Sequence, residues 1–212
     1  MKKLLIILWV LLNFTSYSKS QPNSFYWNYA PVPAVCDPLA IGCAYQGGYI
    51  AYIYQSGDPG YVSGEVHGFV VSQGYITIGV TITWYWWNGT YTTTGATGTA
   101  LGTAATNTTA IVASQGIGSY GAYLCLNYEN GGYSDWYMPS KDELHKIYLA
   151  KDAIGGSWIS GSATPTYMSS SEYDIHGAWI EDFRYGNQWH SVSGCPNPKS
   201  DCPHQLCPIR YF

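Results

Sequence analysis

Short runs of β-branched and aromatic residues, separated by glycine-rich turns, recur along this chain and constrain what it can fold into. Residues 49–54, for example, are followed by the turn Gly57-Asp58-Pro59-Gly60 and then by a second run at 67–72. Runs of this length and composition are typical of strands in antiparallel sheets. The segments that we expect to be strands are 49–54, 67–72, 76–87, 167–173, 178–185, 188–193 and 206–212.

Helix signals are fewer, and the clearest one begins at Ser140. Ser140 and Glu143 have the spacing of a capping box, in which each side chain binds a free backbone N–H group of the other residue. Leu144 and Ile147 then fall on one face. These residues predict a helix that starts at Ser140.

A second helix is expected earlier in the chain. Asn107 is a candidate cap for a short helix that carries Ile111 and continues at 120–126. Residues 88–106, which are mostly Gly, Thr and Ala, predict a surface loop. Strands flanking two helices predict an α+β domain with a largely antiparallel sheet.

The composition narrows the class of protein. The chain has 212 residues, and about 190 remain without a leader, which is enough for one domain with a buried core. Charged residues make up 10%, against about 25% in an ordinary soluble protein, which excludes a disordered acidic segment or a coiled coil. The net charge is −4, and no Lys or Arg lies between Lys19 and Lys141. A basic stripe for phosphates is therefore missing, and we expect no nucleic acid partner.

The first 20 residues have the pattern of a secretory signal peptide. Lys2 and Lys3 form a charged start, and 4–12 is an apolar run too short to span a bilayer. Cleavage is expected before Lys19 or Gln21, and the alternative is an uncleaved membrane anchor. The small residues that precede these positions are Ser16, Ser18 and Ser20. We therefore predict a secreted, extracellular or cell-surface protein with no transmembrane segment after removal of the signal peptide.

The segment after the leader differs from the rest of the chain. Residues 21–47 are rich in proline and aromatic residues and lack a clear periodicity. We expect them to form an N-terminal arm laid over a domain made of residues 48–212.

All six cysteines lie in the exported part of the chain, where structural disulfides are expected. Local closure makes Cys36 with Cys43 the easiest pair, and Cys125 is a candidate long-range partner of a cysteine near the C-terminus. A zinc site is the alternative, although no C-x-x-C pair is present. The disulfide candidates are Cys36, Cys43, Cys125, Cys195, Cys202 and Cys207.

A series of motifs resembles a known protein family. The most specific is Asp135-Trp136-x-x-Pro139-Ser140-x-x-Glu143-Leu144. The segments that carry the resemblance are 48–53, 55–61, 67–68, 87–89, 107–111, 131–144, 169–172, 178–179 and 209–212. Together they resemble the Lcl C-terminal domain family, a domain of unknown function named for a collagen-like bacterial adhesin. The resemblance covers about 48–212 and implies a C-type-lectin-like fold on an exported or surface protein.

Motifs for enzymatic chemistry are scarce. The sequence lacks the H-E-x-x-H, G-x-S-x-G and P-loop patterns, so zinc-protease, hydrolase and nucleotide sites lack their required spacing. The serines at 169–171, with Asp174 and His176, are a candidate nucleophile and its helpers. Alternate side chains on a strand point to opposite faces, which argues against their convergence. We therefore predict that the protein is not an enzyme.

Oxygen ligands suited to calcium are present without a recognised spacing. They are Glu172, Asp174, Glu181, Asp182 and Asn187. Because the spacing matches no calcium-binding loop, we predict no cofactor and a solvated surface, with calcium as the alternative.

Asp135 and Trp136 of the family motif also have two interpretations. They are either residues of a binding site, or a buried indole beside a carboxylate that binds loop N–H groups.

Aromatic residues give the better candidate for binding. Trp84 to Trp87 are consecutive on a predicted strand, so one pair points inward and the other lies on the opposite face. A second group lies in the predicted hairpin from Trp179 to Trp189, where planar hydrogen-bonding groups stand between two indoles. The predicted ligand-binding residues are Trp179, Arg184, Tyr185, Asn187, Gln188 and Trp189.

These features predict a secreted, non-enzymatic recognition module that binds an extracellular polysaccharide, an envelope component or a protein surface. The expected partner is a glycan or a surface protein. The first alternative is a structural or self-assembling surface protein, whose aromatic and Gly-Thr-rich surfaces contact copies of itself. An enzyme of unknown reaction is the third interpretation.

Overall fold

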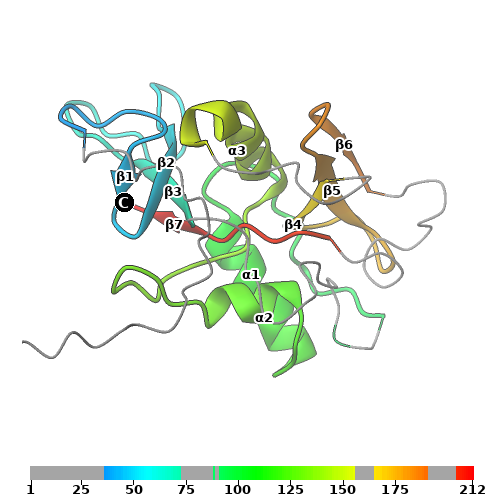
Figure 1. Cartoon of the computed structure of the whole chain (residues 1–212). Coiled ribbons are helices and arrows are strands. Elements are labelled where there is room, and N and C mark those ends of the chain that lie inside the picture. The colour runs from blue at the N-terminus through cyan, green and yellow to red at the C-terminus, as the bar shows by residue number, and fades with distance from the viewer. Residues whose placement is uncertain (1–35, 73–87, 89–90, 156–164, 191–203) are drawn as a thin grey trace, which may run out of the picture.

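The computed structural model describes residues 36–72, 88, 91–155, 165–190 and 204–212. In these residues the chain forms two antiparallel sheets and three helices, which confirms the predicted α+β class. Helix α3 lies between the two sheets and contacts both of them (Figure 1). The predicted leader, most of the arm and the predicted strand 76–87, with Trp84 to Trp87, lie outside the described residues. None of the described helices has the length and apolar character needed to span a bilayer.

A four-stranded antiparallel sheet forms one end of the described structure, with the strand order β1-β2-β3-β7. Its strands are β1 (Ala44–Tyr45), β2 (Gly48–Ile53), β3 (Gly68–Ser72) and β7 (Ile209–Tyr211). Strands β2 and β3 confirm two predicted strands, and β7 is shorter than the predicted segment 206–212. Strand β1 belongs to the segment predicted as an arm, so the end of that segment is part of the sheet.

A three-stranded antiparallel sheet forms the other end, so the strands belong to two sheets rather than one. Its strands are β4 (Thr166–Glu172), β5 (Ala178–Asp182) and β6 (Asn187–Trp189). Strand β5 ends earlier than predicted because Asp182 Oδ1 accepts the Arg184 N–H at 2.6 Å and starts a turn. Gly186 completes that turn with a φ of 73°, a conformation that favours glycine.

Three helices replace the two that the sequence predicted. They are α1 (Ala104–Gln115), α2 (Gly121–Leu126) and α3 (Lys141–Ile154). Asn107 does not cap α1, which already begins at Ala104. The Asn107 side chain is buried and binds both the N–H and the carbonyl oxygen of Gly98, at 3.1 and 2.6 Å. Asn107 therefore fastens the preceding loop to the helix instead of starting the helix.

The predicted capping box of α3 is confirmed. Glu143 Oε2 accepts the Ser140 N–H at 2.8 Å, and Ser140 Oγ accepts the Glu143 N–H at 3.4 Å. The carboxylate does more than cap, because Oε1 also accepts the Gly102 N–H at 2.8 Å and the Tyr211 hydroxyl at 2.7 Å. One buried side chain therefore joins α3, the loop before α1 and strand β7. Its burial raises the pKa of Glu143 above the usual range, against the opposing effect of these hydrogen bonds.

The residues just before α3 connect the remaining elements. Tyr137 exchanges two backbone hydrogen bonds of 2.8 Å with Ile209 in β7. The Met138 N–H binds Thr108 Oγ1 of α1 at 3.0 Å, and the Pro139 carbonyl accepts the Ser170 N–H of β4 at 2.7 Å. The segment that carries the most specific family motif is thus a central connection of the fold.

Apolar side chains form three buried clusters, and β4 separates two of them. Tyr167 belongs to the cluster that joins the four-stranded sheet to α3, whereas the next residue, Met168, belongs to the cluster with α1 and α2. Because neighbouring residues of a strand point to opposite faces, β4 is covered on both sides. Trp136 lies in the third cluster with Ile50 and Val70.

The cysteines only partly follow the expectation of a disulfide framework. Cys36 and Cys43 form a disulfide, as the short loop predicts. Cys125 and Cys207 are buried and form no disulfide with any described residue. Each is packed in an apolar cluster, where a thiol behaves as a small hydrophobic group, and Cys207 contributes to the raised pKa of Cys125. Cys195 and Cys202 lie outside the described residues.

Replacing the Glu143 carboxylate by an amide of the same shape tests whether it stabilises the fold. We expect Glu143→Gln to lower the free energy of unfolding by about 1–3 kcal/mol, because the new NH₂ group faces at least one buried donor. Asp142→Asn is the matched control on the same helical turn, where the carboxylate is 46% exposed and the change should stay within about 0.5 kcal/mol. Denaturant unfolding measures both variants, and equal costs would contradict the role of Glu143.

The buried thiols lead to a second prediction. Burial raises the pKa of both Cys125 and Cys207, so the reactive thiolates are scarce and shielded. We expect iodoacetamide to leave both residues unmodified in the native protein and to alkylate both in denaturant without reductant. Peptide mass spectrometry reads each position separately. Cys36 and Cys43 are the internal control, since they should become alkylated only after reduction.

Candidate functional site

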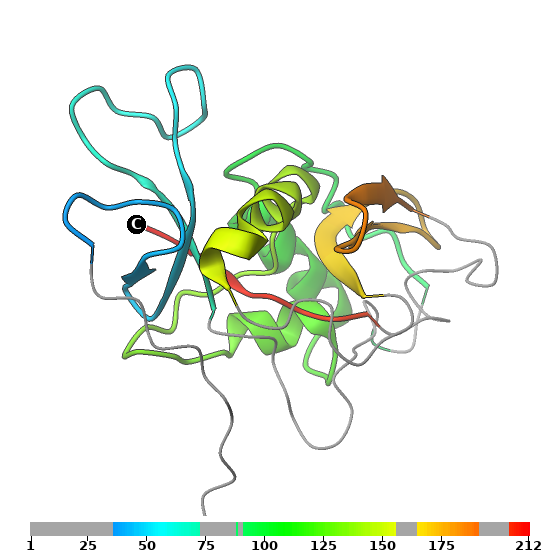
Figure 2. The same cartoon turned by 45° about the horizontal axis from the view of Figure 1, so that its top comes forward.

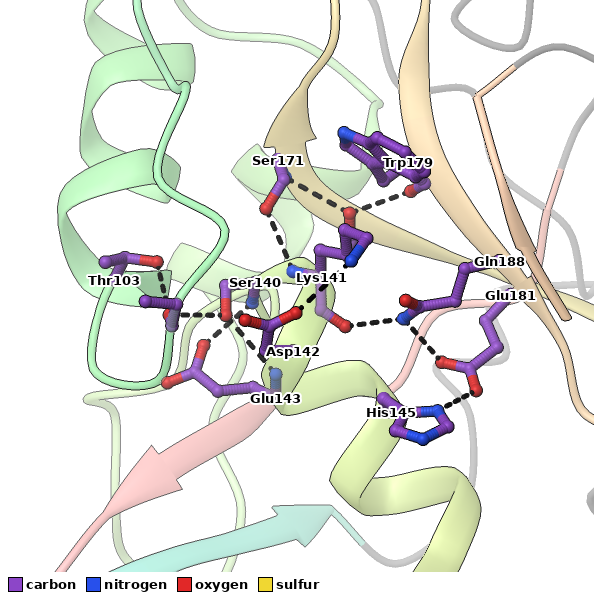
Figure 3. A network of polar contacts seen from close by, with 12 residues as sticks. Thr103, Ser140, Lys141, Asp142, Glu143, His145, Ser171, Trp179, Glu181 and Gln188 are labelled. Atoms are coloured by element: carbon purple, nitrogen blue, oxygen red, sulfur yellow. Dashed lines mark hydrogen bonds and ion pairs between the residues drawn. The ribbon is translucent and has the colours of Figure 1, made fainter. Parts of the chain in front are cut away.

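The candidate site lies where the three-stranded sheet meets the start of α3, two elements that lie side by side in both views (Figures 1 and 2). Trp179 and Glu181 are two residues apart on β5 and therefore share one face of the strand. Gln188 of β6 is paired with Glu181 in the register and lies on the same face. Figure 3 shows these three side chains around the first turn of α3.

Three aromatic rings gather at one end of this face, and we call Tyr173, Trp179 and His190 the aromatic cluster. The Tyr173 and His190 rings are stacked, with centroids 3.4 Å apart and planes at 10°. Trp179 meets both rings edge to face, at 5.7 Å from Tyr173 and 5.1 Å from His190. Tyr173 is 50% exposed. The cluster therefore presents rigidly packed aromatic surface to the solvent.

Lys141, the first residue of α3, also contacts the Trp179 ring. Its ammonium group lies 4.9 Å from the centroid of the Trp179 ring and 3.3 Å from Asp142 Oδ1. The backbone of Lys141 is also held, because its N–H donates to Ser171 Oγ at 2.9 Å and its carbonyl accepts from Gln188 Nε2 at 2.8 Å. These contacts place the lysine against the indole (Figure 3).

Glu181 is a fully buried carboxylate beneath the cluster. Its two oxygens lie 2.7 Å from His145 Nδ1 and 3.1 Å from Gln188 Nε2. Burial raises the pKa of Glu181, and the hydrogen bond from His145 opposes that shift. The His145 imidazole is 41% exposed and stacks on Tyr148 at 5.8 Å. The chain of contacts therefore runs from a solvent-facing imidazole, through a buried carboxylate, to the backbone of Lys141.

The structure separates the predicted ligand-binding residues into three places. Trp179 and Gln188 lie at the site described above. Trp189 pairs with Ile180 on the opposite face of the sheet, packs against the cluster of α1 and α2, and has a buried Nε1 without a hydrogen-bond partner among the described residues. Arg184 and Tyr185 are exposed on the turn between β5 and β6, with the Arg184 guanidinium 5.8 Å from the Tyr185 ring, and Asn187 is exposed at the start of β6.

The serines considered as a candidate nucleophile donate hydrogen bonds to backbone carbonyls. Ser169 Oγ donates to the Trp179 carbonyl, Ser170 Oγ to the Pro139 carbonyl and Ser171 Oγ to the Gly98 carbonyl, at 2.7, 3.1 and 2.7 Å. Asp174 Oδ1 accepts the N–H groups of His176 and Gly177, at 2.8 and 2.6 Å. These side chains hold the β4–β5 turn and the neighbouring loop in place.

Several candidate calcium ligands also accept hydrogen bonds from backbone N–H groups in separate parts of the fold. Glu172 accepts the N–H groups of Thr94 and Gly95 at 3.0 Å, and Asp182 accepts that of Arg184. No group of three or more His, Cys, Asp or Glu side chains with the geometry of a metal site occurs in the described part of the chain.

Asp135 and Trp136 also have local partners. The Trp136 side chain is fully buried and donates from Nε1 to the Tyr133 carbonyl at 3.0 Å. Asp135 binds Arg210 of β7 at 2.5 Å rather than loop N–H groups, and the guanidinium also lies 4.0 Å from the Tyr133 ring. Asp135 therefore connects the motif to the C-terminal strand, whereas Trp136 packs in the cluster with Ile50 and Val70.

No protein-family model matches this chain, and no curated protein is significantly similar to it. The family resemblance stated above therefore remains part of a proposal.

Sequence reasoning missed Lys141, His145, Tyr173 and His190 as parts of the site. One local signal was present, because Lys141 and His145 are four residues apart and share a face of the predicted helix. Tyr173 and His190 gave no such signal, since their contact depends on the register of three strands.

The two tryptophans of the hairpin should differ in stability. Trp189→Ala should lower the free energy of unfolding by on the order of 3 kcal/mol, because it removes an indole packed against the core. Trp179→Ala should cost about 1 kcal/mol, since this indole, which is half-buried like that of Trp189, contacts Lys141, Tyr173 and His190 instead of a core cluster. Denaturant melts of both variants measure the difference, and a larger cost for Trp179→Ala would contradict the assignment of the two faces.

Proposed function

We propose that this protein is a secreted recognition module that binds an extracellular glycan through the aromatic cluster. The observation that carries the proposal is the packed arrangement of Tyr173, Trp179 and His190 at the surface. A sugar ring has an apolar face of C–H groups and a rim of hydroxyl groups, which suits an aromatic surface with polar neighbours. Lys141, whose ammonium group lies 4.9 Å from the Trp179 ring, supplies such a neighbour.

Rigidity supports the same proposal. The indole of Trp179 contacts Lys141, Tyr173 and His190, so its side chain is already ordered and ligand binding would cost little side-chain entropy. Large aromatic side chains with few rotatable bonds are the residues that most often dominate binding energy.

The family and the finer fold assignment belong to this proposal as well. We propose that the domain is C-type-lectin-like and related to the Lcl C-terminal domains. The antiparallel sheets and the central position of 135–144 are compatible with that assignment. Export through the predicted leader would bring the site to extracellular glycans.

A panel of immobilised neutral and acidic polysaccharides tests the function. We expect Trp179→Ala to weaken binding to the best ligand by on the order of 2 kcal/mol, or about thirtyfold, through loss of the stacking surface. The matched control is Tyr61→Ala, which removes another exposed tyrosine, 39% exposed, from the connection between β2 and β3. Equal affinity of wild type and Trp179→Ala would contradict the proposal.

Self-association is the second candidate function, favoured by the exposed apolar side chains Tyr173, Ile175 and Tyr185. Sedimentation over a range of protein concentrations distinguishes the two. A glycan-binding module stays monomeric without ligand, whereas a self-assembling protein gains mass with concentration alone.

A further inference from the structure

The long connection between β2 and β3, residues 54–67, projects from the four-stranded sheet (Figure 2). It has backbone hydrogen bonds of its own, since the Glu65 N–H donates to the Val62 carbonyl at 3.2 Å. Three of its apolar side chains are exposed, namely Tyr61, Val62 and Val66. The connection therefore presents apolar surface on a segment with internal hydrogen bonding.

His67, the last residue of this connection, lies between two oxygen atoms. Its Nε2 atom is 2.7 Å from Glu65 Oε2, and its Nδ1 atom is 3.2 Å from the backbone oxygen of Phe212. Phe212 directly follows β7 and exchanges backbone hydrogen bonds of 3.1 and 3.3 Å with Gly68, the first residue of β3. The imidazole thus joins the connection to the end of the neighbouring strand.

Both oxygen atoms are hydrogen-bond acceptors only. An ionised carboxylate and a backbone carbonyl have no proton to donate, so each contact requires an N–H group of the imidazole. A neutral imidazole carries one N–H group, whereas the imidazolium ion carries two. The charged form of His67 therefore satisfies both contacts, and the neutral ring has to give up one of them.

The surroundings of the ring favour the charged form. The hydrogen bond to Glu65 raises the pKa of His67 above its usual value, the bond to Phe212 and the charge of Glu65 add to this shift, and burial opposes it. From β2, the contact comes from a backbone group that does not titrate, because the Tyr54 N–H donates to the His67 carbonyl at 2.9 Å. Among the described residues, Glu65 is the charged group that contacts the ring.

The raised pKa sets the direction of the pH dependence. A group whose pKa is higher in the folded state contributes stability that is fully present below its unfolded-state pKa, about 6.5 for histidine. This contribution is lost as the pH rises through the folded-state pKa.

We propose that His67 is a pH-sensitive switch that fastens the end of the β2–β3 connection to the C-terminal end of β7. The charged ring binds Glu65 and Phe212 together. Loss of its proton breaks one of the two contacts and loosens the connection that carries Tyr61, Val62 and Val66. The switch belongs to the four-stranded sheet, so the proposal does not depend on the function proposed for the aromatic cluster.

An NMR titration of the His67 ring tests the charged form. We expect a pKa above the usual histidine value in the wild type. Glu65→Gln should lower that pKa, because the amide is uncharged and offers an N–H group to the neutral ring. Asp152→Asn is the matched control, since it removes a carboxylate that is 90% exposed on α3 and should leave the titration unchanged.

Hydrogen exchange tests the loosening. Protection factors, which correct for the intrinsic pH dependence of exchange, should fall about threefold for the Glu65 and Gly68 N–H groups between about pH 5.5 and 8.5. In His67→Gln, whose side chain does not titrate, they should stay constant. A His67 pKa at or below the usual value, or an equal loss of protection in wild type and His67→Gln, would overturn the switch.

Discussion

The rest of the described structure depends on the buried carboxylate of Glu143. It accepts hydrogen bonds from Ser140, Gly102 and Tyr211, which belong to α3, to the loop before α1 and to the C-terminal strand. A buried carboxylate is costly unless its oxygens are satisfied, and here the donors come from parts of the chain far apart in sequence. Satisfying one group thus requires three segments to adopt their native positions together.

The candidate site is built on the same helix end. The capping box fixes where α3 begins. Because Lys141 is the first residue of the helix, this start lets its backbone bind Ser171 of β4 and Gln188 of β6. Trp179 then contacts the Lys141 ammonium group and both stacked rings of Tyr173 and His190. The position of the proposed binding surface is therefore set by helix capping, which favours a preformed site.

The correct sequence predictions concern features that depend on residues close together in the chain. The capping box depends on residues three apart, the disulfide from Cys36 to Cys43 closes a short loop, and strands β2 and β3 follow from their own composition. The prediction that Asn107 caps a helix was wrong, because its side chain binds Gly98, which is nine residues away in a loop without a sequence pattern. The division of Trp179 and Trp189 between two faces depends on the register that pairs Ile180 with Trp189, and no single strand encodes that register.

Many polar side chains near the site already bind the backbone, so the exposed aromatic rings are the surface that a ligand can contact. The hydroxyls of Ser169, Ser170 and Ser171 donate to backbone carbonyls, and the carboxylate of Glu172 accepts from backbone N–H groups. Buried polar groups with complete hydrogen bonding hold their neighbours rigidly but have little left to offer an incoming molecule. The aromatic rings differ, because packing edge to face against one another leaves part of each surface exposed. A site built in this way favours recognition by shape and stacking, and its specificity comes from the spacing of its rings.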